Sequence, residues 1–147
     1  MNFPILSSLI LLPSIGALFL FFTKSNKENS ITVKYVALFT SLVNFFLSVY
    51  LWILFDQSTS EFQFVEDRIW IEGLINYKVG IDGISILFII LTTFITPLCI
   101  ISVNNSIKNR LREFLIAVLV MESFMIGVFC SLDLVVFYLF FEAGLIP

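Results

Sequence analysis

The stretch SLDLVVFYLFFEAGLIP, residues 131–147, decides how this chain folds, because it is almost entirely apolar and carries a glutamate near its centre. If Asp133 marks the start of a membrane helix, Glu142 follows nine residues later. At 1.5 Å per residue the carboxyl lies about 13.5 Å along the axis, close to the middle of a hydrocarbon layer about 30 Å thick. A carboxylate at that depth costs about 2.5–3.5 kcal/mol on insertion scales, so this stretch predicts a functional acid in a membrane helix.

The composition indicates that the whole chain is an all-α integral membrane protein. Of its 147 residues, 59% are hydrophobic and 13% are charged, whereas about 25% of the residues of a soluble domain are charged. The net charge of −3 and the lack of a basic stripe argue against a nucleic-acid partner. The chain contains no histidine, and its two cysteines, Cys99 and Cys130, form no CxxC pair. We therefore expect no haem, iron–sulfur or metal site in this chain.

The apolar runs predict four complete membrane helices and part of a fifth. The fifth run has only about 15 residues, too few to span a bilayer at 1.5 Å per residue, and no stop-transfer charges follow it. We therefore expect the chain to be the front piece of a longer protein, the alternative being a short protein that ends in a half-inserted helix. The predicted helices cover residues 3–22, 35–55, 84–103, 114–130 and 133–147.

Basic residues predict the orientation of these helices. Six of the eight Lys and Arg residues lie in the loops after the first and third predicted helices, so both loops should face the cytoplasm or the mitochondrial matrix. The N-terminus is then outside. The loop between the second and third helices, about residues 56–80, is acidic and should face outward. Its alternating FQF and IWI segments predict a short β-hairpin on the membrane surface, with Trp70 at the headgroup level.

Glu122 is the second acid expected inside the membrane. It lies nine residues before Ser131, so the fourth and fifth helices should hold Glu122 and Glu142 at similar depth. If their faces meet, the two carboxyls titrate as a coupled unit, which suits a proton path. The alternative is that each acid stays protonated and hydrogen-bonds a neighbouring helix.

Three further residues are expected to have structural roles. Pro97 lies inside the third helix, where its ring removes a backbone hydrogen bond to Thr93 and predicts a kink. Asp82 and Asp133 stand directly before the third and fifth helices, where their carboxylates can accept hydrogen bonds as N-caps.

Two long stretches of this sequence resemble one known family. VGIDGISILFIILTTFITPLCI (residues 79–100) and VFCSLDLVVFYLFFEAGLIP (residues 128–147) are similar to signature stretches of chain M of bacterial NADH-quinone oxidoreductase, the equivalent of subunit 4 of mitochondrial complex I. The loop DQSTSEFQFVEDRIWIEG (residues 56–73) also resembles the corresponding loop of that family. The resemblance covers most of the chain.

The resemblance implies the N-terminal part of an antiporter-like bundle of about fourteen helices in the membrane arm of complex I. In that family the glutamate matching Glu142 is the carboxylate of the proton channel, and it works with a lysine on a later, broken helix. NADH, FMN and the iron–sulfur clusters would bind to other subunits, and the implied partners are membrane-arm subunits, lipid and the quinone reduced by the complex. The implied location is the bacterial inner membrane or the mitochondrial inner membrane. Two alternatives are a subunit of a multisubunit cation/proton antiporter or membrane-bound hydrogenase, and a purely structural membrane-arm subunit.

Overall fold

The computed structural model describes residues 4–24, 28, 30–103 and 109–146 of the chain. Among these residues, four helices are long and apolar enough to cross a membrane, and one shorter apolar helix follows them. This agrees with the predicted four complete helices and partial fifth. Pro147, Lys27 and Lys108, on which part of the predicted helix bounds and orientation rests, lie outside the described residues.

The helix bounds differ from the predicted ones mainly at the polar ends. The second helix begins five residues and the fourth three residues before its apolar run, because charged side chains at a helix end remain in reach of water. The shorter last helix ends at Gly144. The elements are α1 (Ile5–Phe22), α2 (Ser30–Leu54), β1 (Gln63–Ile71), β2 (Ile75–Ile81), α3 (Gly83–Ser102), α4 (Leu111–Cys130) and α5 (Leu134–Gly144).

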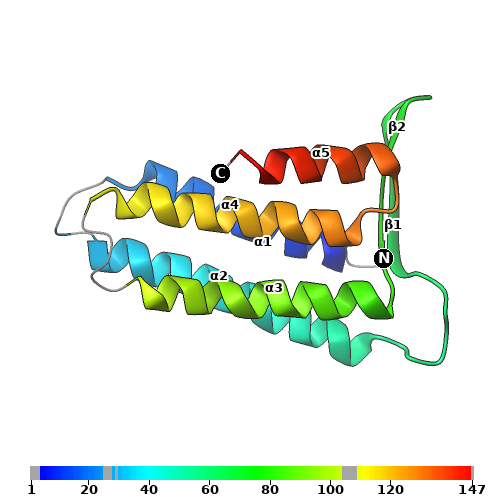
Figure 1. The fold of residues 1–147 in the computed structure, drawn as a ribbon, viewed down its shortest axis with the longest axis horizontal. Helices are drawn as coiled ribbons and strands as arrows, with labels where there is room; N and C mark the ends of the chain where they lie inside the picture. The colour runs from blue at the N-terminus through cyan, green and yellow to red at the C-terminus, as the bar shows by residue number, and fades with distance from the viewer. Residues whose placement is uncertain (1–3, 25–27, 29, 104–108, 147) are drawn as a thin grey trace.

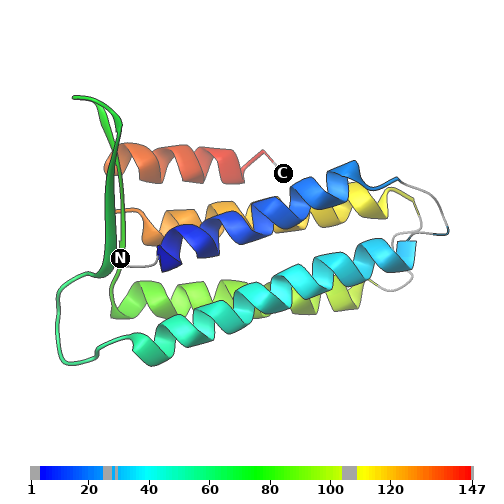
Figure 2. The ribbon, with the colours of Figure 1, turned by 180° about the vertical axis from the view of Figure 1, so that it is seen from behind.

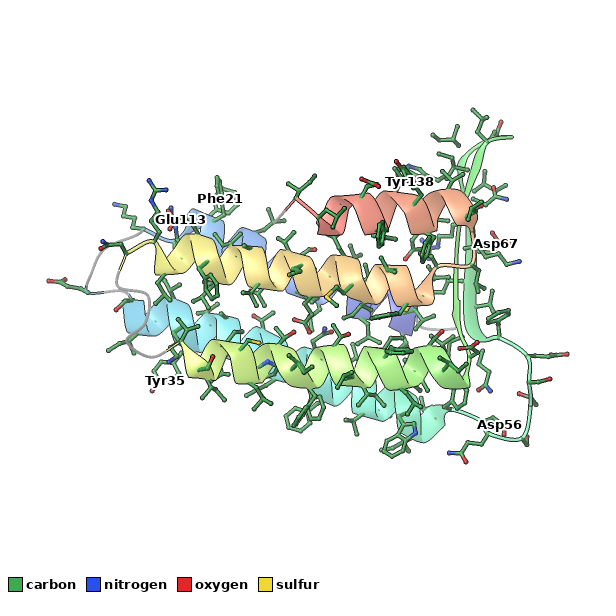
Figure 3. All side chains as sticks on the ribbon, viewed as in Figure 1. Phe21, Tyr35, Asp56, Asp67, Glu113 and Tyr138 are labelled. Atoms are coloured by element: carbon green, nitrogen blue, oxygen red, sulfur yellow. The ribbon has the colours of Figure 1, made fainter. Side chains whose placement is uncertain are left out.

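The four long helices lie side by side, and the β-hairpin stands across one end of them (Figure 1). The view from behind shows the same arrangement, with α5 on one side of α4 and with α2 and α3 on the other (Figure 2). Charged side chains gather at the two ends of the bundle. Asp56 and Asp67 lie at the hairpin end and Glu113 lies at the opposite end (Figure 3).

The bundle interior contains two apolar clusters. The first, near the hairpin, includes Leu9, Leu51, Ile89 and Ile126. The second, toward the other end, is formed by Ala17, Leu20, Val33, Ala37, Ile100, Leu115 and Leu119. Many large apolar side chains on the outward faces are exposed, as expected for helices that face lipid.

The predicted hairpin is present as two antiparallel strands joined at Gly73, whose φ of 76° favours glycine. The hairpin is fastened to the helices at two points. Glu66 accepts hydrogen bonds from the backbone N–H groups of Leu6 (3.1 Å) and Ser7 (3.4 Å) and from the Ser7 hydroxyl. On the other strand, the Lys78 carbonyl accepts a hydrogen bond from the Leu132 N–H at 2.9 Å. The hairpin thus connects the start of α1 with the turn between α4 and α5.

Candidate functional site

Glu142 lies on α5, eight residues after the helix begins at Leu134. That spacing places it about 12 Å along the helix axis. Its side chain is exposed on the surface of the described part of the chain. Within that part, the Glu142 carboxyl makes no hydrogen bond or ion pair. The carboxyl is therefore open to whatever packs against this side of α5.

Glu122 lies on α4 and is only 2% exposed. The Nδ2 atom of Asn44, which is on α2 and fully buried, donates a hydrogen bond to Glu122 Oε1 at 2.9 Å. Both residues stand near the middle of their helices. Helix α4 thus presents a carboxyl to the interior of the bundle, where α2 supplies its partner.

The two acids are not brought together. Phe124 and Gly127 form the side of α4 that faces α5: the ring of Phe124 is 6.4 Å from that of Phe140, and a Cβ at position 127 would be 2.8 Å from the Phe140 ring. Glu122 precedes Phe124 by two residues, which is about 200° around a helix with 3.6 residues per turn. Glu122 therefore faces α2, away from α5, and the described helices contain two separate carboxyls and not a facing pair.

Hydroxyl groups on all four long helices also lie in the middle part of the bundle. Ser48 on α2 is 2.8 Å from Thr93 on α3, and Ser14 on α1 donates to Ser123 on α4 at 2.8 Å. Ser123 in turn donates to the carbonyl of Ile10. The three threonines near Pro97 donate to carbonyls of their own helix, those of Phe88, Ile89, Ile90 and Thr92, and not to the Thr93 carbonyl that Pro97 leaves free.

Asp82 and Asp133 are the N-caps of α3 and α5. Asp82 Oδ1 accepts a hydrogen bond from the Ser85 N–H at 2.8 Å, and Asp133 Oδ1 accepts one from the Val135 N–H at 2.8 Å. The backbone hydrogen bond from Ser85 holds the pKa of Asp82 below its usual value.

Pro97 is buried within α3, which continues for five residues past it. Cys99 is exposed and Cys130 is buried, each as a free thiol.

No ion pair joins a cation to Glu122 or Glu142 in the described part of the chain. The ion pair there joins Arg112 to Glu113 at 3.7 Å, near the start of α4. No group of three or more acidic or thiol side chains that could hold a metal ion occurs among the described residues.

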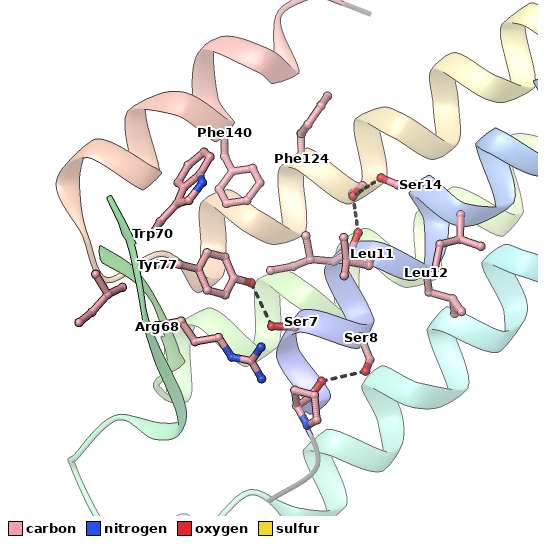
Figure 4. Close-up of a pocket in the computed structure, with 15 residues that line it drawn as sticks. Ser7, Ser8, Leu11, Leu12, Ser14, Arg68, Trp70, Tyr77, Phe124 and Phe140 are labelled. Carbon is pink, nitrogen blue, oxygen red and sulfur yellow. Dashed lines mark hydrogen bonds between the residues drawn. The ribbon is translucent and has the colours of Figure 1, made fainter. Parts of the chain in front are cut away.

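A groove of about 830 Å³ runs between α1, α4, α5 and the hairpin (Figure 4). Arg68, Trp70 and Tyr77 border it from the hairpin, and Tyr77 is 3.1 Å from the Ser7 hydroxyl. Burial raises the pKa of Tyr77. Ser14 and Ser123 line the groove, whereas Glu122 does not. The buried Glu122 carboxyl therefore does not open into the groove.

Two residues of this arrangement were not singled out from the sequence. The sequence does indicate Asn44, because Ser41, Asn44 and Ser48 recur at helical spacing within an apolar run. The structure buries all three side chains fully. Glu66 had none, because its contacts join the hairpin to a helix about 60 residues earlier in the chain.

Comparison with known proteins identifies the family. Residues 8–128 match the family model described as the amino terminus of NADH-ubiquinone oxidoreductase chain 4. The chain is 47% identical over 143 residues to NADH-ubiquinone oxidoreductase chain 4 of Marchantia polymorpha, covering 97% of this chain and 28% of that protein. It is 44% identical over 151 residues to NADH-quinone oxidoreductase subunit M of Rickettsia conorii, covering 100% of this chain and 31% of that protein.

A third relative gives the highest identity of the three over a shorter alignment. The chain is 57% identical over 114 residues to NADH-quinone oxidoreductase subunit M of Rhodobacter capsulatus, covering 78% of this chain and 22% of that protein. The chain thus spans less than a third of the length of these relatives. These matches confirm the resemblance drawn from the sequence: the chain belongs to the family of the amino-terminal region of NADH-ubiquinone oxidoreductase chain 4.

Proposed function

We propose that this chain is the N-terminal membrane region of an antiporter-like, proton-translocating subunit in the membrane arm of a respiratory NADH:quinone oxidoreductase. The observation that carries this proposal is the position of Glu142 in a chain of this family. It is a carboxyl about 12 Å along an apolar helix, on a surface that the described helices leave open. An acid in such a position is expensive to keep in a membrane unless it has a function.

Glu142 is the proton-binding group of this mechanism, and its neighbours control when the proton leaves. When a cation such as a lysine ammonium approaches the carboxyl, the ionised form is favoured and the proton is released. When the cation withdraws, the protonated form is favoured and a proton is taken up. Glu142 is open to such a partner, because no described side chain occupies its carboxyl. Glu122 is a second proton-binding position on the other side of α4.

The distribution of charge supports a defined orientation. The hairpin end carries a cluster of acids, and the opposite end carries Lys24, Arg110 and Arg112. By the positive-inside rule the hairpin end faces outward and the opposite end faces the cytoplasm or matrix. Protons are then taken up from the basic end and released at the hairpin end.

The partners follow from the proposed membership of the complex. The outward apolar faces of the helices contact lipid or other membrane-arm subunits, and the quinone is reduced elsewhere in the complex. NADH, FMN and iron–sulfur clusters bind to other subunits. The membrane is the inner membrane of a bacterium or of a mitochondrion.

Replacing Glu142 by glutamine tests this proposal. Glutamine keeps the size of the side chain and cannot release a proton, so we expect Glu142→Gln to abolish or severely reduce proton pumping and coupled turnover while the complex still assembles. Pumping is measured as acidification of inverted membrane vesicles driven by NADH, with quinone reduction recorded in parallel and assembly checked on native gels.

Glu72→Gln is the matched control, because Glu72 is an exposed acid in the hairpin turn. This variant should pump like the unaltered enzyme. An assembled Glu142→Gln enzyme that pumps protons at a near-normal rate would rule out the assigned role of Glu142.

A further inference from the structure

A layer of polar side chains separates the two apolar clusters of the bundle. On each helix, these residues lie in the sequence between residues of the hairpin-end cluster and residues of the opposite cluster. Ser48, Thr93 and Ser123, for example, lie between Leu51 and Ala37, between Ile89 and Ile100, and between Ile126 and Leu119 of their helices. The layer consists of Ser14, Ser41, Asn44, Ser48, Thr92, Thr93, Thr96, Glu122 and Ser123.

Every hydroxyl of this layer donates a hydrogen bond, whereas two other polar atoms of the layer have no hydrogen-bond partner among the described residues. Each serine and threonine of the layer donates to a backbone carbonyl or to another hydroxyl. Asn44 Oδ1 and Glu122 Oε2, in contrast, are buried and lack a hydrogen-bond partner in the described part of the chain. Both belong to the side chains that are already joined by the bond from Asn44 Nδ2 to Glu122 Oε1.

One proton would satisfy both atoms if Oε2 and Oδ1 face each other. An ionised carboxylate only accepts hydrogen bonds, so with Glu122 ionised the two orphan oxygens are both acceptors and neither helps the other. A protonated Oε2 becomes a donor, and the amide and the carboxylic acid then have complementary edges. In such a pair, Asn44 Nδ2 donates to Oε1, as the structure shows, and the Oε2 hydroxyl would donate to Asn44 Oδ1. An unpaired buried polar atom costs about 1–3 kcal/mol, so this closed pair is strongly favoured over the ionised one.

No charged group faces Glu122 from the helices packed around it. Helix α1 has no ionisable side chain, and Cys99 of α3 is exposed. On α2, Lys34 lies ten residues before Asn44, and Tyr35 and Tyr50 are exposed. The remaining ionisable groups are at the ends of α4 or exposed on α5: Arg112, Glu113, Cys130, Tyr138 and Glu142.

We propose that Glu122 holds a proton in the resting protein as a closed acid–amide pair with Asn44, and that Asn44 is the positioning residue of this second proton site. The site is separate from Glu142, since the Glu122 carboxyl is bonded to α2 whereas Glu142 is exposed on α5. Release of the proton breaks the bond from Oε2 to Oδ1 and leaves two buried acceptors. The proton therefore leaves only when a water molecule or a cation supplies a replacement donor. The transport role of this site rests on the proposed function, whereas its protonation does not.

Infrared spectroscopy of the assembled complex in its membrane tests the protonation directly. A protonated carboxyl has a C=O stretching band apart from those of carboxylates and amides. We expect Glu122→Gln to remove one such band while the complex still assembles, because a glutamine amide can pair with Asn44 through both of its edges. Asn44→Leu should shift the same band to higher frequency, because Glu122 Oε1 loses its donor. Unchanged absorption in this region in Glu122→Gln would overturn the proposal.

Stability measurements show whether Asn44 and Glu122 form a hydrogen-bonded pair or are only two buried polar side chains. Asn44→Leu leaves the acid without a partner, so thermal inactivation of the complex should occur at a lower temperature. The double variant Asn44→Leu/Glu122→Leu removes both polar groups and should recover most of that loss. Additive effects of the two changes would contradict the pair.

Glu142→Gln is the control that keeps the two proposals apart. It should leave the Glu122 band in place whether or not it stops pumping. If Glu142→Gln pumps normally and keeps the Glu122 band, only the proposed function is rejected. If Glu142→Gln loses pumping but the unaltered enzyme has no Glu122 band, only the inference about Glu122 and Asn44 is rejected.

Discussion

Glu66 is the residue that holds the hairpin against the first helix. Its carboxylate accepts from the first N–H groups of α1, which have no partner within the helix, and it stands at the positive end of the helix dipole. Asp67, the next residue, is an exposed acid whose side chain makes no such contact in the described part of the chain. Of these two adjacent acids in β1, Glu66 therefore joins the hairpin to α1, whereas Asp67 is exposed to solvent.

We expect Glu66→Ala to weaken this junction by about 1–2 kcal/mol, a change of roughly 5- to 30-fold in the local opening equilibrium. Hydrogen exchange in the assembled complex measures it, as faster exchange of the Leu6 and Ser7 amides. Asp67→Ala should leave both amides protected. Equal exchange in the two variants would show that the carboxylate of Glu66 does not hold the helix end.

At the scale of elements, the contact between α4 and α5 depends on the absence of a side chain at Gly127. A Cβ there would lie 2.8 Å from the Phe140 ring, whereas a Cβ at Gly144 would be 3.8 Å from Phe124, an ordinary contact. The close packing of α5 on α4 is therefore set at one of these two glycines. This packing also determines which face of α5 contacts α4 and which face, carrying Glu142, stays exposed.

Gly127→Ala should lower the stability of the complex by about 1–3 kcal/mol, because the ring must move out of a packed interface. Gly144→Ala should have a much smaller effect. Phe140→Leu, combined with Gly127→Ala, should recover part of the loss by making room. Thermal inactivation of the assembled enzyme compares the variants, and equal losses in the two alanine variants would contradict this account of the interface.

At the scale of the whole molecule, the asymmetry of charge predicts how the chain crosses the membrane. A cysteine placed at Glu72 in the hairpin turn should react with a membrane-impermeant maleimide added to intact cells or mitoplasts. A cysteine at Glu28, between α1 and α2, should react only after permeabilisation. Both are introduced into a Cys99→Ser background, because Cys99 is exposed. The reverse pattern of labelling would invert the proposed direction of proton flow.

How far the sequence predicts this structure depends on the range of the interactions involved. The helices follow from apolar runs and the hairpin from alternation, because both signals are local. Glu122 and Glu142 stand out as acids in apolar runs for the same reason. Which way Glu122 points could not be predicted, because it depends on how α4 is rotated against α2 and α5. The hydrogen bonds from α1 to Glu66 could not be predicted either, because they join segments that are distant in the sequence.

The two attachments of the hairpin also imply an order of assembly. As the chain emerges from the ribosome, α1 and the hairpin are made before α4 and α5 exist. The Glu66 attachment can therefore form first, and the strand that carries Lys78 then waits with an unused carbonyl. When the loop containing Leu132 crosses the membrane, it meets an acceptor already in place. We therefore expect the hairpin to guide the placement of the last helix, so that a defect in the early attachment appears as misplacement of that helix.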